Sequence, residues 1–332
     1  MRIGVIGAGS WGTTVADLLV RNGHDVTIWA READVVESIR TAHENTVFLP
    51  GVALAPALHA EATIGTAVAD AELVVSAAPS HAVRTVAGEI AASLHGHRPI
   101  VVSISKGLEA GTHDRMSTLL EEVLSGCPVV ALSGPSFAKE VAEHQPTAVV
   151  AASDDIPAAH AVQHAFSNAY FRVYSSGDVV GVELGGALKN VIAIAAGILD
   201  GLGLGYNPRA ALITRGLAEI SRLGHALGAD PLTFAGLAGM GDLILTATGA
   251  LSRNRSLGVE LGKGRSLEEI LAGRVSVAEG VRTARTAVEL GEAHGVELPI
   301  AQEVSRVLFE QKDPRQAIQD LMERELKAEQ WR

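Results

Sequence analysis

Short apolar runs alternate with amphipathic stretches over the first half of the chain. The runs that predict buried parallel strands occupy positions 2–6, 25–30, 73–77, 100–103 and 129–132, and shorter runs at 147–151 and 171–174 fit further strands. The stretches with helical spacing lie between them, at positions 13–22, 34–42, 81–94 and 115–124. Strands that alternate with helices in this way are typical of an α/β, doubly wound sheet.

The pattern changes near Asp178, where strand-like runs stop and Ala, Leu, Gly and Glu follow at helical spacing. We therefore predict two domains, an α/β domain over 1–180 and an all-α domain over 181–332. The longest predicted helix, 179–199, is apolar on most faces and is expected to be buried. The other predicted helices of this half lie at 209–224, 232–237, 256–262, 266–272, 281–294 and 301–309, before a charged tail over 314–332.

The first predicted strand leads directly into Gly7-Ala8-Gly9-Ser10-Trp11-Gly12 at the start of a helix. In a strand–turn–helix context, G-x-G-x-x-G predicts a dinucleotide-binding turn of a Rossmann-like fold. The first glycine permits the tight turn, the second lets the backbone approach a pyrophosphate, and the third lets the helix pack on the strand. Free N–H groups at the helix N-terminus would face the phosphates. A glycine-rich turn without a ligand is the alternative for a bare match.

The end of the second predicted strand bears on the choice of cofactor. An NAD site commonly places Asp or Glu there to accept hydrogen bonds from the ribose 2′-OH, whereas this chain has Ala30-Arg31. A guanidinium suits a 2′-phosphate, so Arg31 favours NADP. Glu32 follows directly and can still reach a ribose, which leaves NAD open.

Composition and charge exclude several classes of protein. The 332 residues are 47% apolar and 20% charged, as in globular proteins with real cores. The net charge is −11, from 27 Lys and Arg against 38 Asp and Glu, and no long basic run is present, which argues against nucleic acid as a partner. Anionic ligands must therefore meet locally gathered Lys, Arg or helix N-termini.

The cellular setting follows from cysteine content and hydropathy. Cys127 is the single cysteine, which excludes an internal disulfide and fits a small buried residue. The N-terminus lacks the pattern of a signal peptide. The longest apolar run, 191–199, has nine residues, whereas a membrane helix needs about 20. We therefore expect a cytoplasmic protein with no membrane span.

Lys189 and Asn190 lie inside the long apolar helix, between Gly185-Gly186-Ala187 and an aliphatic run. Burying a lysine costs free energy because desolvation disfavours its charged form. Lys189 can serve as a lysine of lowered pKa that passes a proton to or from a reacting oxygen. The alternative is that its aliphatic stem lets the ammonium reach the surface.

Two further polar clusters follow. Asp242 lies in Gly239-Met240-Gly241-Asp242, where glycines allow close backbone approach, with a helix-capping aspartate as the alternative. Ser252-Arg253-Asn254 precedes the predicted helix at 256–262. A hydroxyl, a guanidinium and an amide at a helix start can hold a monophosphate, and a solvated polar loop is the alternative.

Seven such motifs occur in one order along nearly the whole chain, and together they resemble the NAD(P)-dependent glycerol-3-phosphate dehydrogenases, most closely the soluble bacterial type. The motifs are Gly7 to Thr13, Ser105-Lys106-Gly107, Ser133 to Glu140, Leu188-Lys189-Asn190, Thr214 to Glu219, Gly236 to Leu243, and Ser252-Arg253-Asn254. One small departure is Thr246-Ala247-Thr248-Gly249, where the family often has Ser or Asp in place of the glycine. Cofactor choice also varies within the family at the position of Arg31.

The resemblance implies roles for these residues. Lys189 would be the proton acceptor in glycerol 3-phosphate oxidation and the donor in dihydroxyacetone phosphate reduction. Lys106 would contact both cofactor and substrate and lower the pKa of Lys189. Implied substrate contacts are Lys106, Gly134, Ser136, Lys189, Asn190, Asp242, Ser252, Arg253 and Asn254. Implied cofactor contacts are Gly7, Gly9, Ser10, Trp11, Gly12, Arg31, Lys106, Ala138, Arg253, Val277 and Glu279. No metal is implied.

The first interpretation is thus a dehydrogenase of a phosphorylated three-carbon substrate that feeds phospholipid synthesis, with NADP preferred over NAD. A second interpretation is another β-hydroxy acid or acyl-thioester dehydrogenase with the same two-domain plan. The presence of Lys189-Asn190 and Ser252-Arg253-Asn254 argues against this second interpretation. A third is a nucleotide-sensing module without turnover. The cofactor preference ratio, the dominant reaction direction, feedback regulators and a homodimeric state are left open.

Overall fold

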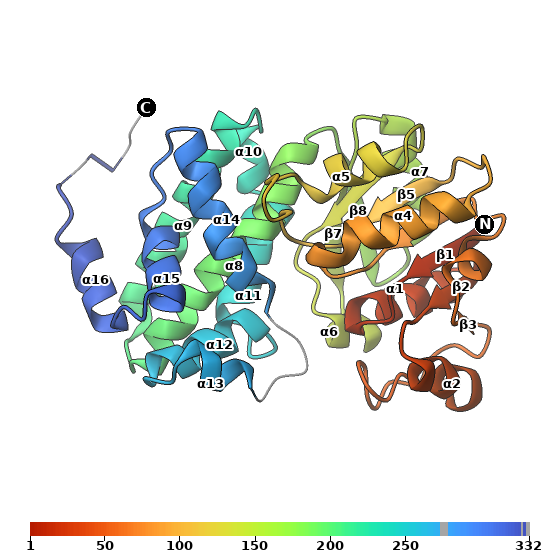
Figure 1. The fold of residues 1–332 in the computed structure, drawn as a ribbon, viewed down its shortest axis with the longest axis horizontal. Helices are drawn as coiled ribbons and strands as arrows, with labels where there is room; N and C mark the ends of the chain where they lie inside the picture. The colour runs from red at the N-terminus through yellow and green to blue at the C-terminus, as the bar shows by residue number, and fades with distance from the viewer. Residues whose placement is uncertain (273–277, 327, 330–332) are drawn as a thin grey trace.

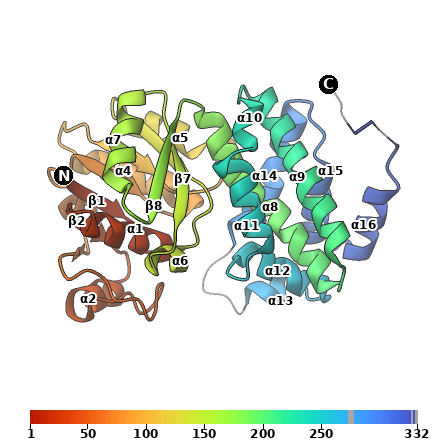
Figure 2. The same ribbon diagram turned by 180° about the vertical axis from the view of Figure 1, so that it is seen from behind.

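The computed structural model describes residues 1–272, 278–326 and 328–329. A sheet with helices on its faces occupies one side of the molecule, and a group of helices occupies the other (Figure 1). Seen from behind, α8 (Val179–Gly201) begins beside the sheet and runs into the helical half (Figure 2). The N-terminus lies on the side of the sheet, and α16 (Pro314–Met322) lies at the opposite end of the molecule.

The described residues contain one eight-stranded sheet, whose spatial order is β3-β2-β1-β4-β5-β6-β7-β8. Its strands are β1 (Arg2–Ile6), β2 (Asp25–Trp29), β3 (His59–Glu61), β4 (Leu73–Ser76), β5 (Ile100–Ser103), β6 (Val129–Ser133), β7 (Thr147–Ala152) and β8 (Phe171–Ser176). Every neighbouring pair is parallel except β6 and β7, which are antiparallel. The predicted doubly wound, Rossmann-like sheet is confirmed.

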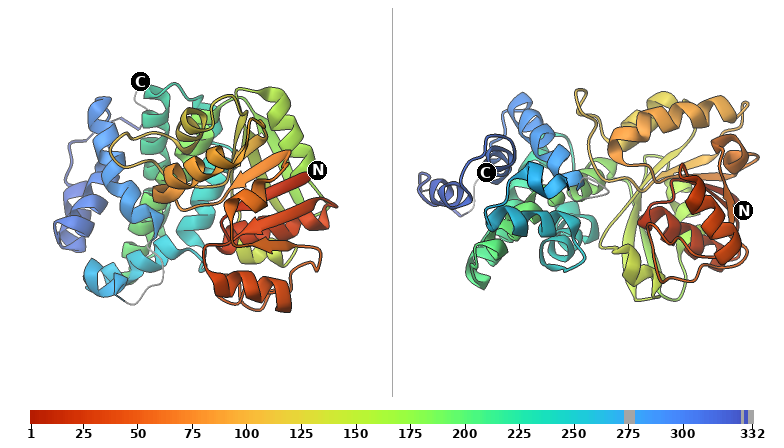
Figure 3. Two further views of the ribbon diagram at one scale, coloured as in Figure 1. Left: turned by 45° about the vertical axis from the view of Figure 1, so that its right-hand side comes forward. Right: turned by 60° about the horizontal axis from the view of Figure 1, so that its bottom comes forward.

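The helices of the first half are α1 (Ser10–Arg21), α2 (Ala33–Ala42), α3 (Ile64–Val68), η1 (Ser80–Ala82), α4 (Val83–Ser93), α5 (Met116–Val123), α6 (Ala138–Ala142) and α7 (Ile156–Phe166). Those of the second half are α8 (Val179–Gly201), α9 (Tyr206–Ala226), α10 (Pro231–Phe234), η2 (Leu237–Gly241), α11 (Asp242–Thr248), α12 (Arg253–Gly262), α13 (Leu267–Leu271), α14 (Glu279–Ala293), α15 (Pro299–Phe309) and α16 (Pro314–Met322). Figure 1 shows α12 and α13 below α8, and both views of Figure 3 show α16 on the outer edge of the helical half. The predicted helical second half is therefore confirmed, whereas the domain limits 1–180 and 181–332 stay a prediction.

Three local features differ from the sequence pattern. Strand β3 and helix α3 were not expected, because His59–Glu61 has no apolar run and α3 has only five residues. Ser80, which directly precedes the helix predicted over 81–94 and has the residue type of an N-cap, instead begins η1, and its hydroxyl donates to Glu279. Helix α12 begins at Arg253 rather than Ser256, because Ser252 accepts a hydrogen bond from the backbone N–H of Arg255 and caps it.

Helix α8 forms the centre of the helical core. Its residues from Val182 to Leu199 are all buried, and its aliphatic side chains pack with those of α9, α11, α12, α14 and α15. By length and composition alone α8 resembles a membrane span, but 94% of its most apolar window is buried inside the protein, as in a core helix. Its close fit with α12 depends on small residues, since a Cβ at Gly197 would lie 2.0 Å from the carbonyl oxygen of Arg255.

Candidate active site

The three glycines of the first turn have different surroundings. Gly7 has a φ of +123°, and a Cβ there would lie 2.9 Å from the carbonyl of Ala77. A Cβ at Gly12 would lie 2.0 Å from the carbonyl oxygen of Gly7, so strand, turn and helix pack too closely for a side chain. A Cβ at Gly9 would meet nothing within 4 Å. Backbone packing therefore requires Gly7 and Gly12, whereas Gly9 leaves open space at the helix entrance.

The N-terminus of α1 is suited to an anion. Its N-cap, Gly9, offers no side-chain cap, and the first turn contains no acidic residue. Asn45, which is buried, donates to the carbonyl of Ala8 and to the hydroxyl of Thr13, both at 2.8 Å, and so holds the turn in place. Ser10 donates through its hydroxyl to the carbonyl of Phe48. These residues fit the pyrophosphate of a dinucleotide.

Three other expected cofactor contacts differ in their surroundings, namely Trp11, Arg31 and Ala138. The Trp11 ring packs against Phe171, with ring centroids 6.4 Å apart. Arg31 follows β2, has a side chain that is 83% exposed, and donates to Glu32 at 2.9 Å. The carbonyl of Ala138 accepts a hydrogen bond from Thr14 at 3.2 Å, which places α6 beside α1. The cofactor roles expected for these residues stay predictions.

Glu279 joins the helical half to the sheet. It is the first residue of α14, and its carboxylate accepts hydrogen bonds from the hydroxyl of Ser80 at 2.5 Å and from the Ser80 backbone N–H at 3.3 Å. Ser80 follows β4, at the carboxyl edge of the sheet, where ligands bind in this type of fold. Val277, another expected cofactor contact, lies outside the described residues.

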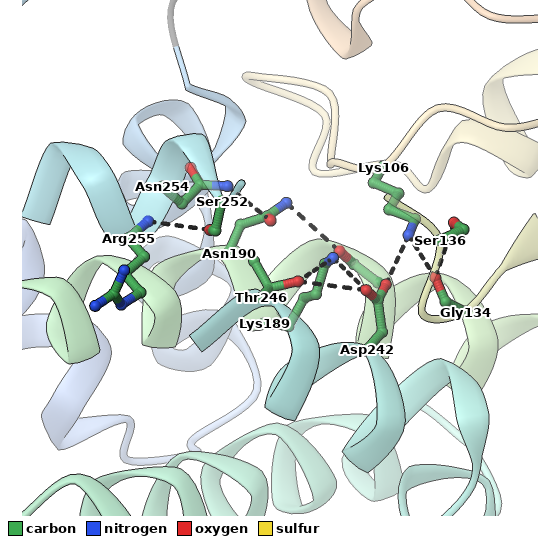
Figure 4. A network of polar contacts seen from close by, with 11 residues as sticks. Lys106, Gly134, Ser136, Lys189, Asn190, Asp242, Thr246, Ser252, Asn254 and Arg255 are labelled. Atoms are coloured by element: carbon green, nitrogen blue, oxygen red, sulfur yellow. Dashed lines mark hydrogen bonds and ion pairs between the residues drawn. The ribbon is translucent and has the colours of Figure 1, made fainter. Parts of the chain in front are cut away.

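Two lysines from different halves of the chain meet on one carboxylate. Lys106 follows β5 and donates to Asp242 at 2.6 Å and to the carbonyl of Gly134 at 3.0 Å. Lys189, on α8, donates to the other oxygen of Asp242 at 2.5 Å and to the hydroxyl of Thr246 at 2.7 Å. Figure 4 shows Asp242 between the two ammonium groups. We call Lys106, Lys189, Asp242 and Thr246 the lysine–aspartate cluster.

Burial and charge set the protonation of this cluster. Lys189 is only 6% exposed, which rules out the alternative that its ammonium reaches the surface. Burial lowers the pKa of Lys189, Asp242 raises it in part, and the charge of Lys106 lowers it further, to about 7. Burial raises the pKa of Asp242, but the charges of Lys106 and Lys189 outweigh burial and hold it below its ordinary value. At neutral pH, Asp242 is thus ionised, while the charged and the neutral forms of Lys189 are both populated.

Asp242 is not a helix cap, since Gly241 holds the N-cap position of α11 and the carboxylate is turned to the lysines. Ser136 donates to the carbonyl of Gly134 at 3.1 Å, so the loop after β6 reaches the same cluster. Thr246 is a polar residue of the cluster to which sequence reasoning had assigned no role. The signal that could have identified Thr246 is its position one helical turn after Asp242, which places both side chains on the same face of α11.

A second polar group lies beside the cluster. Asn254 donates to the side-chain oxygen of Asn190 at 2.8 Å and accepts from the backbone N–H of Gly280 at 3.0 Å, which joins α8, α12 and α14. Ser252 and Asn254 are buried, whereas Arg253, on the first turn of α12, is exposed. The structure therefore brings Asn190, Ser252 and Asn254 together near Lys189 (Figure 4).

Not every sequence motif lies in this region. Glu219, from the Thr214 to Glu219 motif, accepts hydrogen bonds from the backbone N–H groups of Ile300 and Ala301 and so caps α15. A cavity of about 730 Å³ beside it lies between α8, α9, α15 and α16, and no member of the lysine–aspartate cluster lines it. Within the described ranges, no group of three or more His, Cys, Asp or Glu side chains is arranged to hold a metal ion.

Comparisons with known proteins agree with this arrangement. The NAD-dependent glycerol-3-phosphate dehydrogenase N-terminus profile matches residues 2–159, and the corresponding C-terminus profile matches residues 178–319. A glycerol-3-phosphate dehydrogenase [NAD(P)+] from Geobacter sulfurreducens is 55% identical over 99% of each chain.

Two solved structures extend the comparison to the fold. A crystal structure of glycerol-3-phosphate dehydrogenase from Coxiella burnetii is 38% identical, with a TM-score of 0.93 over 97% of this chain and 98% of that one. The yeast glycerol-3-phosphate dehydrogenase from Saccharomyces cerevisiae is 28% identical, with a TM-score of 0.82 over 98% and 99% of the two chains. The chain therefore belongs to the NAD-dependent glycerol-3-phosphate dehydrogenase family.

Proposed function

We propose that this chain interconverts sn-glycerol 3-phosphate and dihydroxyacetone phosphate with an NAD(P) cofactor. Its relatives carry this activity in their names, and the lysine–aspartate cluster supplies the acid–base chemistry that the reaction needs. When bound, the nicotinamide cofactor supplies the redox chemistry by exchanging a hydride with the substrate carbon. The protein then has to bind both partners, polarise one oxygen and move one proton.

Lys189 is the group that moves the proton. In oxidation, the neutral Lys189 amine accepts the proton of the hydroxyl on the carbon that loses hydride. In reduction, the charged Lys189 ammonium donates a proton to the carbonyl oxygen as that carbon gains hydride. A pKa of about 7 leaves both forms populated at neutral pH, which suits a group that works in both directions.

The neighbours of Lys189 hold and tune it. Asp242 and Thr246 fix the position of its nitrogen through short hydrogen bonds. Asp242 binds Lys106 through one carboxylate oxygen and Lys189 through the other, and so keeps the two ammonium groups close together. Lys106 can therefore stabilise negative charge that develops on the substrate oxygen. Asp242 acts as a fixed anion and keeps two ammonium groups together in a buried place.

The substrate phosphate is assigned to the start of α12. Arg253 supplies a positive charge there, the helix N-terminus supplies its dipole, and Ser252 and Asn254 supply polar side chains beside Asn190. Gly134 and Ser136 complete the substrate set from the sheet side. This assignment puts the phosphate on the helical half and the transferred hydride at the boundary with the sheet.

The cofactor set follows from the first turn and its surroundings. Gly7, Gly9 and Gly12 with the N-terminus of α1 would hold the pyrophosphate, since Gly9 leaves the space that a side chain would fill. Ser10, Trp11, Ala138, Arg253, Val277 and Glu279 complete the proposed contacts. Cytoplasmic location and a role in glycerophospholipid synthesis belong to the same proposal, whereas a homodimer is left open.

We expect Arg31→Asp to shift the cofactor preference from NADPH toward NADH by about 10-fold or more in kcat/KM. The exposed Arg31 guanidinium, held beside Glu32, would lose a charge-assisted contact to a 2′-phosphate and gain a carboxylate that suits a free 2′-OH. Both cofactors offered in one competition experiment measure the ratio directly. Arg40→Asp, nine residues further along the chain on α2, is the control, and an unchanged ratio in Arg31→Asp would contradict the assignment.

A substrate panel tests the function as a whole. The purified chain should consume NADPH or NADH when given dihydroxyacetone phosphate, and not when given β-keto acids, 3-oxoacyl thioesters or unphosphorylated dihydroxyacetone. Turnover of an acyl thioester would favour the second dehydrogenase interpretation. Cofactor binding without turnover of any compound would favour a nucleotide sensor.

A further inference from the structure

A buried carboxylate outside the lysine–aspartate cluster lies one and a half turns before Lys189 on α8. Glu183 has a side chain that is 6% exposed, and its two oxygens accept three hydrogen bonds from α5 and its N-cap. The donors are the Ser117 backbone N–H at 2.9 Å, the Ser117 hydroxyl at 2.5 Å and the Arg115 guanidinium at 2.8 Å. We call Arg115, Ser117 and Glu183 the Glu183 clasp.

The clasp satisfies groups that the sheet half cannot satisfy alone. Arg115 is the N-cap of α5 and makes no side-chain cap, so the free N–H of Ser117 would stay unpaired in a buried place. Glu183 accepts that N–H from another part of the chain and places a negative charge at the α5 N-terminus, which the helix dipole favours. The clasp is thus a buried ionic link between α8 and the sheet half of the protein.

The clasp also holds the loop that carries Lys106. This loop joins β5 to α5, and Leu108 forms a β-bridge with Arg115, so Arg115 lies opposite a residue only two positions from Lys106. Arg84 binds both oxygens of Glu109 at 2.7 and 2.8 Å and fixes the next residue of the loop. A shift of Arg115 would therefore be transmitted through the bridge to Lys106.

One stripe of α8 joins the clasp to the point where the helix passes closest to Lys106. Glu183, Gly186 and Asn190 follow at i, i+3 and i+7 and share a face of the helix. At Gly186 the helix passes so close to the sheet that a Cβ would lie 2.5 Å from the Ser133 hydroxyl and 3.6 Å from the Lys106 side chain. The stripe thus begins at the clasp and meets Lys106 at Gly186, about 4.5 Å further along the helix, while Lys189 projects from another face of α8.

We propose that Glu183 is a positioning residue, which, together with Arg115 and Ser117, sets the separation between Lys106 on the sheet half and Lys189 on α8. The proposal rests on the proposed proton-transfer role of Lys189. Without the clasp, the loop and α8 would move apart, and Lys106 would no longer sit close to Lys189. The groups that face Lys189 are Asp242, Thr246 and Lys106. Those near Glu183 are Arg115, Ser117 and Glu121.

The test measures the protonation of Lys189 directly. The chain has six lysines, so ¹³C labelling at lysine Cε gives few NMR signals, and single Lys→Arg variants assign them. In Glu183→Gln we expect Lys189 to titrate at higher pH than in the unchanged chain, because the positive charge of Lys106 is farther away. Its neutral fraction at pH 7 should fall about three-fold or more, and kcat should fall about 10-fold with little change in cofactor affinity.

A matched control separates positioning from general stability. Glu303 on α15 is equally buried and pairs with Arg306 and Lys312, far from the cluster. Glu303→Gln should lower the melting temperature without moving the Lys189 titration. The double variant Glu183→Gln/Arg115→Gln removes the clasp without leaving the half-buried Arg115 guanidinium unpaired. It replaces the single variant in the titration if Glu183→Gln does not fold.

The outcomes are distinct. An unchanged Lys189 titration in both clasp variants would overturn the positioning role and make Glu183 a structural residue only. If the pKa of Lys189 changes while the pH at which kcat/KM for oxidation rises does not, the positioning role of the clasp is supported and the proton-transfer role of Lys189 is refuted. If the pKa of Lys189 and the pH at which kcat/KM rises change together, the positioning role of the clasp and the proton-transfer role of Lys189 are both supported.

Discussion

Lys189→Ala is expected to lower kcat by about 10²- to 10⁴-fold in both reaction directions, because the substrate oxygen loses the only nearby group in the described cluster with a pKa near 7. Asp242 stays ionised and cannot donate a proton, and Thr246 is bound to Lys189 itself. Steady-state rates with NADPH and dihydroxyacetone phosphate, and with NADP and glycerol 3-phosphate, measure the loss.

The control for Lys189→Ala is binding. The first turn and α1 lie on the sheet half, whereas Lys189 lies on α8, so cofactor affinity should stay within about two-fold, as measured by quenching of protein fluorescence. Lys263→Ala, on the exposed end of α12, should keep full activity. Full activity in Lys189→Ala would show that another group moves the proton.

Asp242→Asn is expected to lower both activity and stability. The amide removes the anion between Lys106 and Lys189, which leaves two buried or half-buried cations without their shared partner. Loss of one partner of a buried ion pair costs about 3–5 kcal/mol, and kcat should fall about 10²-fold or more because neither ammonium is held in place. Thermal unfolding and steady-state kinetics measure the two effects.

The pH dependence of Asp242→Asn has a defined direction. Asp242 raises the pKa of Lys189 in the unchanged chain, so its removal lowers that pKa below about 7. The residual oxidation rate should then persist to lower pH than in the unchanged chain. The double variant Asp242→Asn/Lys106→Met should regain part of the lost stability, because one unpaired cation is removed. A melting temperature that is unaffected by Asp242→Asn would contradict the ionic role.

Local sequence pattern was enough to predict the framework and two local features of the candidate site. G-x-G-x-x-G after an apolar strand identified the turn, and a lysine inside an aliphatic helix identified Lys189, because burial of a cation without purpose is costly. The strands with continuous apolar runs were found with small shifts at their ends. In each of these cases the residues that form the pattern are neighbours in the sequence.

Pairings between distant segments could not be read from the sequence. Asp242 was open to a capping role because nothing in Gly239 to Asp242 shows that two lysines, 136 and 53 residues away, converge on it. Ser80 had the residue type of a helix cap, but Glu279 binds it from another part of the chain. Glu183 had no apparent role for the same reason, since its partners lie on α5.

The pH profile of kcat/KM for glycerol 3-phosphate oxidation tests the central claim most directly. In the unchanged chain the rate should rise as pH increases through about 7, because the proton acceptor must be neutral, and in reduction it should fall over the same range, because the donor must be charged. In Lys189→Ala the residual oxidation rate should lose this limb. A limb near pH 7 that survives in Lys189→Ala would contradict the assignment of the proton to Lys189.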